Sequence, residues 1–483
     1  MSGRVTSDGV PWPTTSPTAA ERASFADAEP RPFWLDRMPA RDFAAPLSEA
    51  TETDLGIVGG GFTGLWAALQ AKAEDPGRDV VLLEAETIGF GASGRNGGFV
   101  IASLTHGLEN GLSRFADEIE LLERLGRENM AGLVEDLSLH GIDCDLELTG
   151  ELMPSVAPYQ DRWPEQIRAH HERFGYEVEV FPDAESVQRE VASPIYRGGA
   201  WIKDAGGILD PGKLAAGLLA ACERAGVRVF ERTPVTAVEG AGDAVRLRAP
   251  AGSVTARRVL LGTSAYPPLL RPVHRYVAPV YDYALITEPL SAAQREAIGW
   301  RRRQGIGDGG NRFHYYRLTK DERILWGGFD AVYRYGGPVR PELDEDPATF
   351  ARLAQNFFTT FPQLEGLRFS HRWGGAIDTC SRFSAFFGTA LGGRVAYATG
   401  YTGLGVAATR FGARVALDLL DGRDTEATRS RYVRSKPVPF PPEPFRTAVI
   451  QLTRNRLAAA DRRGGRRGLW LGLLDRLGLG FDS

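Results

Sequence analysis

A glycine cluster near residue 60 has a spacing that points to a specific chemistry. Gly59, Gly61 and Gly64 satisfy the pattern GxGxxG between a short apolar run and a stretch with helical periodicity. Glycines in such a turn let the backbone approach a pyrophosphate, and the amides at the positive end of the helix receive its charge. Glu84 follows 20 residues after Gly64, where a carboxylate can accept hydrogen bonds from ribose hydroxyls. The spacing therefore predicts a dinucleotide-binding strand, turn, helix and strand over residues 54–84.

A second GxGxxG match, formed by Gly305, Gly307 and Gly310, lacks this context. It follows the run RRRQ and precedes a strand candidate, so we interpret it as a loop and not as a nucleotide site. The pattern alone is weak evidence, because the same chain contains a second match without the required context. The assignment of the first match to nucleotide binding depends on the strand before it and the helix after it.

The segment 91–98 is a second polar glycine loop, directly after the dinucleotide unit. Ser93, Arg95 and Asn96 bring a hydroxyl, a guanidinium and an amide to close spacing. Such a loop can hold anionic or polar groups of a cofactor. Taken alone, a polar surface loop explains the segment equally well.

The elements that must position these residues alternate between helix and strand patterns. Patterns at 54–84, 205–270 and 395–421 predict a Rossmann-like sheet assembled from separated segments, and the aromatic stretch 273–330 predicts an antiparallel sheet. The expected fold class is therefore α/β with a second, antiparallel-sheet domain. We expect an irregular leader over 1–50, a nucleotide-binding domain over 51–105, 196–270 and 372–425, a substrate domain over 106–195 and 271–371, and a C-terminal tail over 426–483.

Composition argues against several classes of protein. The 483 residues carry a net charge of -4, so no global positive field attracts nucleic acid. The three cysteines lie far apart, the N-terminal residues show no signal peptide, and glycines interrupt the longest uncharged stretch, 55–71. The pair His170-His171 has no third ligand at helical spacing, so we predict no metal site. These features predict a cytoplasmic protein.

The segment from Arg446 to Ser483 is a basic tail. Its eight arginines and three aspartates give it a charge of +5, and LWLGLLDRLGLGF has apolar residues at helical spacing. An amphipathic lid on the protein's own body is the favoured interpretation. An oligomer contact and a weak membrane-surface anchor remain as alternatives.

The two glycine loops together resemble the flavin-binding start of the D-amino acid oxidase superfamily of FAD-dependent oxidoreductases. GFGASGRNGG (89–98) is similar in particular to the gamma-glutamylputrescine oxidase branch, and the resemblance extends over roughly residues 50–425. Its further motifs are GGILDPGKLAAGL (206–218), VLLGTSAY (259–266), ITEPL (286–290), YYRLTKDERILWGG (315–328), RWGG (372–375) and GYTGLGV (400–406).

This resemblance implies FAD as the cofactor and a set of residues that bind it. The pyrophosphate would be held by Gly59, Gly61, Phe62, Thr63 and Gly64, the adenosine ribose by Glu84, and the adenine by the backbone of Val235. Ser93, Arg95, Asn96 and Gly97 would run beside the pyrophosphate and flavin, and Gly403, Leu404 and Gly405 would close on the isoalloxazine.

Two departures from the family qualify this set. Close relatives often carry His where Leu404 stands, which leaves a polar contribution from that loop open. Some sarcosine oxidases attach their flavin through a cysteine shortly before the last glycine loop, but Cys380 does not fall at the equivalent position. We therefore expect noncovalent FAD.

The resemblance also implies an activity, the oxidation of an amine or amino acid C–N bond. Hydride would pass to flavin N5, the imine would hydrolyse, and oxygen or another acceptor would reoxidise the flavin. Two alternatives stay open: an NAD-dependent dehydrogenase, which would not need the two later glycine motifs, and a non-enzymatic flavin-bound scaffold.

The strand candidate 313–317 supplies the expected substrate wall. Alternation places Phe313, Tyr315 and Arg317 on one face, and His314 and Tyr316 on the other. The family uses an aromatic residue of this strand to line the substrate cavity, which implies that role for Tyr315. Arg317 would pair either with a substrate carboxylate or with an acidic side chain of the sheet.

Overall fold

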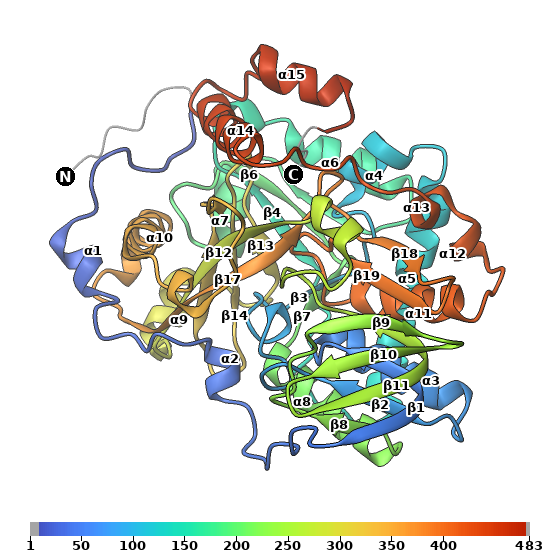
Figure 1. The fold of residues 1–483 in the computed structure, drawn as a ribbon. Coiled ribbons are helices and arrows are strands. Elements are labelled where there is room, and N and C mark those ends of the chain that lie inside the picture. Colours follow the sequence, from blue (N-terminus) through green and yellow to red (C-terminus); the bar gives the residue numbers. More distant parts are fainter. Residues whose placement is uncertain (1–8, 480–483) are drawn as a thin grey trace.

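The computed structural model describes residues 9–479, and its strands form an eight-stranded, a nine-stranded and a two-stranded sheet. Figure 1 shows β1, β2 and β8–β11 at the lower right, with the strands of the nine-stranded sheet above and to their left. The helices are α1 (Ala19–Ala23), α2 (Phe33–Asp36), α3 (Phe62–Glu74), α4 (Leu108–Phe115), α5 (Ile119–Leu139), α6 (Trp163–Glu172), α7 (Ala184–Glu190), α8 (Pro211–Arg224), α9 (Ala292–Ile298), α10 (Pro347–Thr360), α11 (Ala408–Leu420), α12 (Glu426–Arg429), α13 (Arg431–Arg434), α14 (Phe445–Asp461) and α15 (Leu469–Arg476).

The eight-stranded sheet is the Rossmann-like sheet that the sequence predicts. Its strands are β1 (Ala50–Val58), β2 (Val80–Leu83), β8 (Arg228–Phe230), β9 (Ala237–Ala241), β10 (Ala244–Ala249), β11 (Gly252–Leu261), β18 (Phe386–Ala390) and β19 (Val395–Thr399). β19, β11, β1, β2 and β8 are parallel neighbours. Helices α3, α8 and α11 share a hydrophobic core with this sheet, which explains why β2 is a continuous apolar run that is buried throughout.

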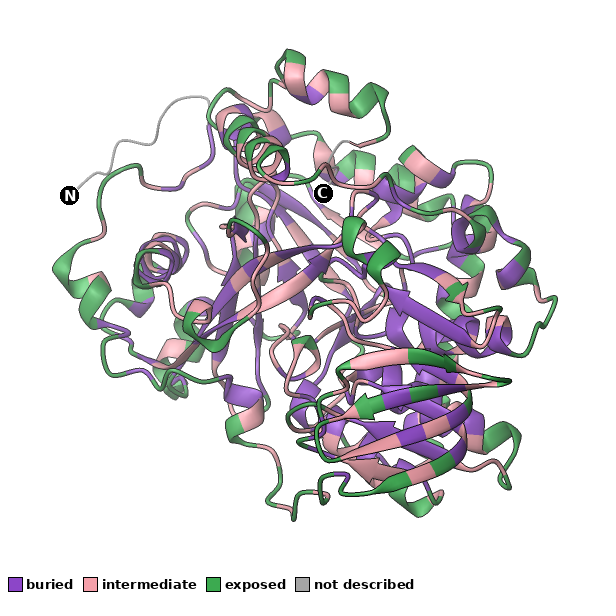
Figure 2. Cartoon of the chain, viewed as in Figure 1, coloured by how far each residue is buried: buried purple, intermediate pink, exposed green. Residues whose placement is uncertain are grey.

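The nine-stranded sheet forms most of the second domain. Its strands are β4 (Glu151–Ser155), β5 (Val178–Phe181), β6 (Gly198–Ile202), β12 (Ala278–Thr287), β13 (Gly305–Gly307), β14 (His314–Leu318), β15 (Ile324–Gly328), β16 (Val332–Tyr333) and β17 (Phe369–Thr379). Helix α10 packs on β12, and the aromatic side chains of this sheet form a separate core. Figure 2 shows buried residues running along the strands of both large sheets. The small sheet, β3 (Phe99–Ile101) with β7 (Gly206–Ile208), is antiparallel.

The sheet to which each strand belongs differs in places from the expected segments. β6 and all but the first three residues of β17 lie in the segments assigned to nucleotide binding, yet both strands pair in the nine-stranded sheet. Conversely, α5 lies in the segment assigned to the substrate domain but buries Leu122 and Leu133 in the core beside the Rossmann-like sheet. Propensity predicts a strand or a helix but not its partner, so the domain boundaries stay a prediction that these pairings refine.

The second GxGxxG match is not a simple loop. Gly305 and Gly307 belong to β13, which pairs with β14 on one side and β4 on the other, and no helix follows it. The interpretation as a loop is therefore wrong for Gly305 and Gly307. A strand of three residues with a glycine at each end has too few side chains to reveal a period of two in the sequence.

The leader contains more order than its composition indicates. Among its described residues, 9–50, α1 and α2 form, and Trp12 and Trp34 are buried in the second domain. Arg41 makes a bidentate ion pair with the buried Glu231, which follows β8. These anchors attach the leader to both domains.

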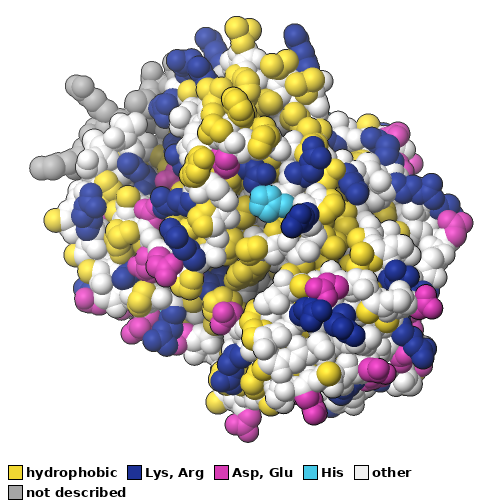
Figure 3. Space-filling view, viewed as in Figure 1, with side chains coloured by type: hydrophobic (Ala, Val, Ile, Leu, Met, Phe, Trp, Pro, Cys, Tyr) yellow, Lys and Arg dark blue, Asp and Glu magenta, His cyan; other side chains and the backbone are white. Residues whose placement is uncertain are grey.

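The basic tail docks on the body through α14. Asp461 at the end of α14 is 1% exposed and accepts hydrogen bonds from the backbone amides of Asn311 and Arg312. Helix α15 rests on α14, and Figure 3 shows hydrophobic and basic side chains gathered at the top of the molecule, where Figure 1 places both helices. Residues 480–483 lie outside the described part of the tail. Within residues 9–479, no helix has both the length and the apolar composition needed to cross a bilayer.

Candidate functional site

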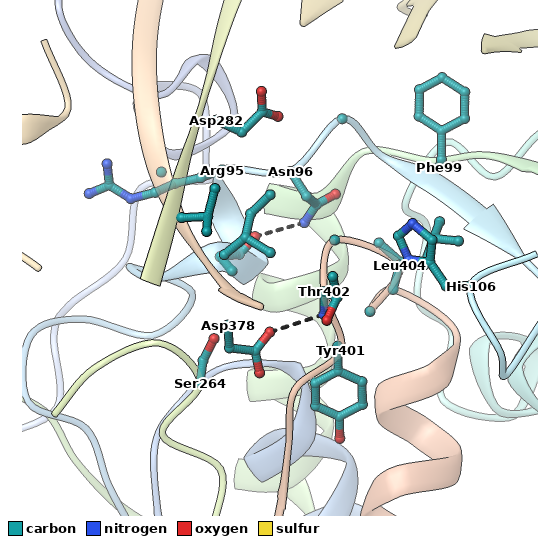
Figure 4. Close-up of a pocket in the computed structure, with 18 of the residues that line it drawn as sticks. Arg95, Asn96, Phe99, His106, Ser264, Asp282, Asp378, Tyr401, Thr402 and Leu404 are labelled. Atoms are coloured by element: carbon teal, nitrogen blue, oxygen red, sulfur yellow. Dashed lines mark hydrogen bonds between the residues drawn. The ribbon is translucent and has the colours of Figure 1, made fainter. Parts of the chain in front are cut away.

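A cavity of about 1320 Å³ is lined by residues from both large sheets. It exceeds the roughly 300–1,000 Å³ of a typical small-ligand site, so it has room for a dinucleotide and a further small molecule. All the predicted site residues line it except Gly64 and Arg317. Figure 4 shows side chains from the 95–106 segment, β12, the end of β17 and the 401–404 loop facing this space.

The glycine turn after β1 needs its glycines for three different reasons. Gly59 has a φ of +108°, and a Cβ there would lie 2.4 Å from the carbonyl oxygen of Gly262. A Cβ at Gly64 would lie 1.9 Å from the carbonyl oxygen of Gly59, so this residue lets α3 pack against the turn without facing the cavity. A Cβ at Gly61 would meet only Ser93 and would otherwise project into open space. The hollow above Gly61 is thus the place where a pyrophosphate can approach the start of α3.

Glu84 is held at the end of β2 by the same turn. One carboxylate oxygen accepts a hydrogen bond from the amide of Gly60 at 2.6 Å, and the other accepts from Glu86 at 2.9 Å. Burial raises the pKa of Glu84, while these two bonds oppose that shift. The side chain lines the cavity together with Val235, which lies in the segment after β8. The arrangement suits a carboxylate that accepts from a ribose.

The second glycine loop connects the start of α3 to the second domain. Oγ of Ser93 accepts a hydrogen bond from the amide of Phe62 at 2.8 Å and so caps the helix that begins there. The loop backbone is clamped by two tryptophans: Trp34 donates to the carbonyl of Asn96 at 2.9 Å, and Trp373 donates to that of Arg95 at 2.8 Å. Neither tryptophan was expected to contact this loop.

The polar side chains of this loop are already engaged within the protein. The Arg95 guanidinium bonds Oδ2 of Asp344 at 2.6 Å and the carbonyl of Phe90 at 2.8 Å. The Asn96 amide donates to the carbonyls of Ala92 and Ser93. These two side chains therefore shape the loop, and Figure 4 shows the guanidinium of Arg95 directed away from Asn96.

The loop after β19 is positioned by a buried carboxylate that sequence reasoning missed. Asp378, which is 4% exposed, accepts hydrogen bonds from the amide of Gly400 at 2.6 Å and that of Thr402 at 3.3 Å. Burial raises its pKa to about 6 although these amides favour the charged form. Gly403, with a φ of +95°, turns the chain toward Leu404, and both line the cavity.

An imidazole faces the same part of the cavity as Leu404. His106 comes from the loop before α4, and Figure 4 shows it beside Leu404. Its Nδ1 is buried without a hydrogen-bond partner among the described residues, and burial lowers its pKa to about 4. A neutral imidazole thus lies near the position where the sequence analysis left a polar contribution open. No local pattern reveals it, because the two residues line the same cavity from segments about 300 positions apart in the sequence.

Tyr315 lines the cavity, on the face of its strand that alternation predicts. Its ring lies against the second glycine loop, since a Cβ at Gly97 would be 2.7 Å from Cε2 of the ring. The ring also packs edge-on against Phe99 at a centroid distance of 5.8 Å. On the other face of β14, His314 and Tyr316 are buried against Trp326. The structure therefore places Tyr315 at the cavity and its two neighbours in the core.

Arg317 shares the face of Tyr315 but does not line the cavity. Its guanidinium lies 4.9 Å from the centre of the Trp34 ring, and burial lowers its pKa to about 10. It is 3% exposed and forms no ion pair in the part of the chain that the structure describes. The expected ion pair with an acidic side chain of the sheet is therefore wrong for the described residues, because Trp34 of the leader covers the guanidinium instead. The pairing with a substrate carboxylate stays a prediction.

Asp282 on β12 is a further cavity residue that the sequence analysis missed. Its Oδ2 accepts a hydrogen bond from Oη of Tyr315 at 2.7 Å, and burial raises its pKa to about 6. The only available signal was an acidic residue inside an aromatic strand run. Within residues 9–479, no group of three or more metal-ligating side chains is arranged to hold an ion. His170 bonds Glu109, and His171 bonds the carbonyl of Ile167.

Comparisons with known proteins agree with this geometry. The family described as FAD dependent oxidoreductase matches residues 54–419. Gamma-glutamylputrescine oxidoreductase of Escherichia coli is 34% identical over 391 residues, covering 78% of this chain and 85% of that protein. A probable oxidoreductase of Haemophilus influenzae is 28% identical over 385 residues, with the same coverage of 78% and 85%.

Solved structures of lower identity share the fold. Glycine oxidase from Geobacillus kaustophilus has a TM-score of 0.64 at 18% identity, over 80% of this chain and 99% of that one. Fructosyl amine:oxygen oxidoreductase from Aspergillus fumigatus has a TM-score of 0.62 at 16% identity, over 80% of this chain and 90% of that one.

Proposed function

The chain belongs to the FAD-dependent oxidoreductase family, and from that premise we propose that it oxidises the C–N bond of an amine or amino acid. FAD, when bound, accepts a hydride from the carbon next to the substrate nitrogen, and water then hydrolyses the imine product. The protein contributes binding, orientation and electrostatics around that transfer. Oxygen or another acceptor completes the cycle.

The residues of the cavity fit FAD. A Cβ at Gly61 would have only Ser93 within 4 Å, so a larger side chain there would project into the cavity. Glu84 lies at the end of β2, where a ribose hydroxyl can donate to it. All three cysteines are buried and none lines the cavity, which is consistent with noncovalent attachment.

The contact between Tyr315 and Gly97 carries the proposal. It joins the wall of the antiparallel sheet to the loop that follows the dinucleotide unit. A substrate held against Tyr315 therefore lies next to the loop expected to run along the cofactor. Asp378 orients the opposite loop through the amides of Gly400 and Thr402, so the reacting region is enclosed between two positioned segments.

Anaerobic bleaching of the flavin tests the function. We expect purified protein to carry FAD that acid releases, and one of four classes to bleach it: polyamines, N-acyl polyamines, D-amino acids or N-methyl amino acids. A protein without flavin absorbance would favour the NAD-dependent alternative. A flavin that no amine bleaches would favour the scaffold alternative.

Two further predictions belong to the same proposal. A cytoplasmic location is supported by three free cysteines, which suit a reducing compartment. A role of the tail in membrane-surface contact or self-association is supported by the exposed Leu469, Leu473 and Leu477 on and just after α15.

A further inference from the structure

Two glycines of β13 leave a groove on the cavity face of the second sheet. Gly307 pairs with Tyr315 of β14, and Gly305 pairs with Glu151 of β4. Residues paired across neighbouring strands project from the same face of a sheet. Tyr315 and Glu151 therefore rise from one face, and the strand between them contributes no side chain there.

The groove is closed at one end and open toward Glu151. A Cβ at Gly305 would lie 2.5 Å from Cε1 of Phe99, so this ring covers that end. A Cβ at Gly307 would meet a single atom within 4 Å, Oε1 of Glu151 at 3.2 Å. One glycine of the second GxGxxG match, Gly307, therefore leaves the Glu151 carboxylate accessible from the Tyr315 wall, a role unrelated to nucleotides.

The Glu151 carboxylate has no partner in the described part of the chain. It makes neither a side-chain hydrogen bond nor an ion pair, and burial alone raises its pKa to about 7. The nearby Arg303 is already engaged by Glu147 and Glu322. A partly buried carboxylate without a partner is costly, and a cation would offset that cost.

The charge of the cavity lining points the same way. Nine carboxylic side chains and three arginines line it. Two of these arginines, Arg95 and Arg312, are paired with Asp344 and Asp330. The lining therefore favours a cationic ligand over a carboxylate.

We propose that Glu151 binds a second, non-reacting ammonium group of the substrate, so that this enzyme prefers diamines to monoamines of equal length. The inference rests on the proposed amine oxidation. The backbones of Tyr315 and Glu151 stand two strand spacings apart, on the order of 10 Å across the sheet. An alkyl chain lying over Gly307, which Phe99 leaves uncovered, joins the Tyr315 wall to the Glu151 carboxylate. Glu151 acts as a specificity residue and takes no part in the transfer at the reacting carbon.

Titration of the holoenzyme with matched amines tests this assignment. The probes are 1,4-diaminobutane and 1,5-diaminopentane against n-butylamine and n-pentylamine, with binding followed anaerobically by the flavin spectrum and by calorimetry. We expect each diamine to bind the wild type at least about 10-fold more tightly than its monoamine, the effect of one charged hydrogen bond. Glu151→Gln should abolish this ratio and leave the dissociation constants of the monoamines unchanged.

Two other variants make the test specific. Glu179→Gln removes a carboxylate from β5 of the same sheet, outside the cavity, and should preserve the diamine preference. Gly307→Ala places a methyl group against Oε1 of Glu151 at a position whose φ is not positive. It should weaken diamine binding selectively while FAD content is retained, and it decides the matter if the Gln variant folds poorly.

The failures of the two proposals are distinguishable. Equal binding of diamines and monoamines by the wild type, or an unchanged ratio in Glu151→Gln and Gly307→Ala, overturns the role of Glu151. The proposed function survives that result if any amine or amino acid bleaches the flavin. A flavin that none of them bleaches overturns the function itself.

Discussion

Oη of Tyr315 donates a hydrogen bond of 2.7 Å to Oδ2 of Asp282 across an intervening strand. Tyr315 lies on β14 and Asp282 on β12, with β15 between them. A Cβ at Gly327 of β15 would lie 2.5 Å from Oη, so only glycine at that position lets the phenol reach over the strand. The bond fixes a ring that lines the cavity and that we propose as the substrate wall.

Removing the Tyr315 ring should impair catalysis. Tyr315→Ala should slow flavin reduction on the order of 100-fold, the loss that misplacement near reacting atoms can produce. Tyr315→Phe keeps the wall but deprives Asp282 of its donor, so its effect should be smaller. Rapid-reaction absorbance measures both. Tyr316→Phe, which loses only a bond to Tyr196 in the core, is the control; slower reduction there than in Tyr315→Ala would place the wall on the other face.

The Asp282 carboxyl should make stability depend on pH. Burial raises its pKa from 3.8 to about 6, so the folded state holds this proton more tightly than the unfolded state. The stability it contributes is present below pH 4 and is lost as the pH rises through 6. Relative to Asp282→Asn, the wild type should lose up to about 3 kcal/mol over this window. Denaturant unfolding of both proteins from pH 4 to 8 measures the difference, and a constant gap would contradict the assignment.

A branched side chain at Gly61 should prevent FAD binding. Gly61→Val places carbon atoms in the hollow bordered by Ser93, where the pyrophosphate is expected, and a Cβ there lies 2.9 Å from Oγ of Ser93. We expect a colourless protein, measured by the ratio of visible to ultraviolet absorbance. Gly240→Val is a matched control on β9, since a Cβ at Gly240 meets nothing within 4 Å. A Gly61→Val protein that still binds a full complement of FAD would contradict the assignment of this turn to the pyrophosphate.

The tail should stabilise a wall of the cavity through Asp461. This carboxylate also accepts hydrogen bonds from the side chains of Asn311 and Tyr159, so Asp461→Ala leaves several buried donors unpaired. We expect a loss of about 2–4 kcal/mol in unfolding free energy, with FAD still bound. Thermal unfolding followed by flavin fluorescence measures both.

Deleting residues 466–483, which include α15, should leave the unfolding temperature nearly unchanged because this helix rests on α14. Deleting 446–483 should lower it. If the tail has a surface role, both deletions should also reduce sedimentation with liposomes or self-association. A stable protein without residues 446–483 would show that the docking contributes little.

Arg317 should act on stability and not on substrate choice. Its guanidinium packs over Trp34 outside the cavity. Arg317→Ala should therefore lower the unfolding temperature but leave the ratio of dissociation constants for amino acids and plain amines unchanged. A selective loss of carboxylate substrates in this variant would restore the pairing that the sequence suggested.

The sequence by itself determined the strand, glycine turn, helix and strand that line the cavity, because this unit is local. The turn at 59–64, the helix after it and Glu84 lie within about 30 consecutive residues. Backbone sterics demand glycine at Gly59 and Gly64, whereas Gly61 leaves a hollow above the start of α3. Alternation along 313–317 likewise determined which side chains share a face, since a strand has a period of two.

Only the tertiary structure decided what those faces meet. Asp282 reaches Tyr315 across a strand from another segment, Trp34 of the leader covers Arg317, and β13 brings Glu151 within reach of the same groove. Each of these contacts joins residues more than 30 positions apart. Burial and partners at such separations depend on how sheets pair, and neither propensity nor spacing encodes that pairing.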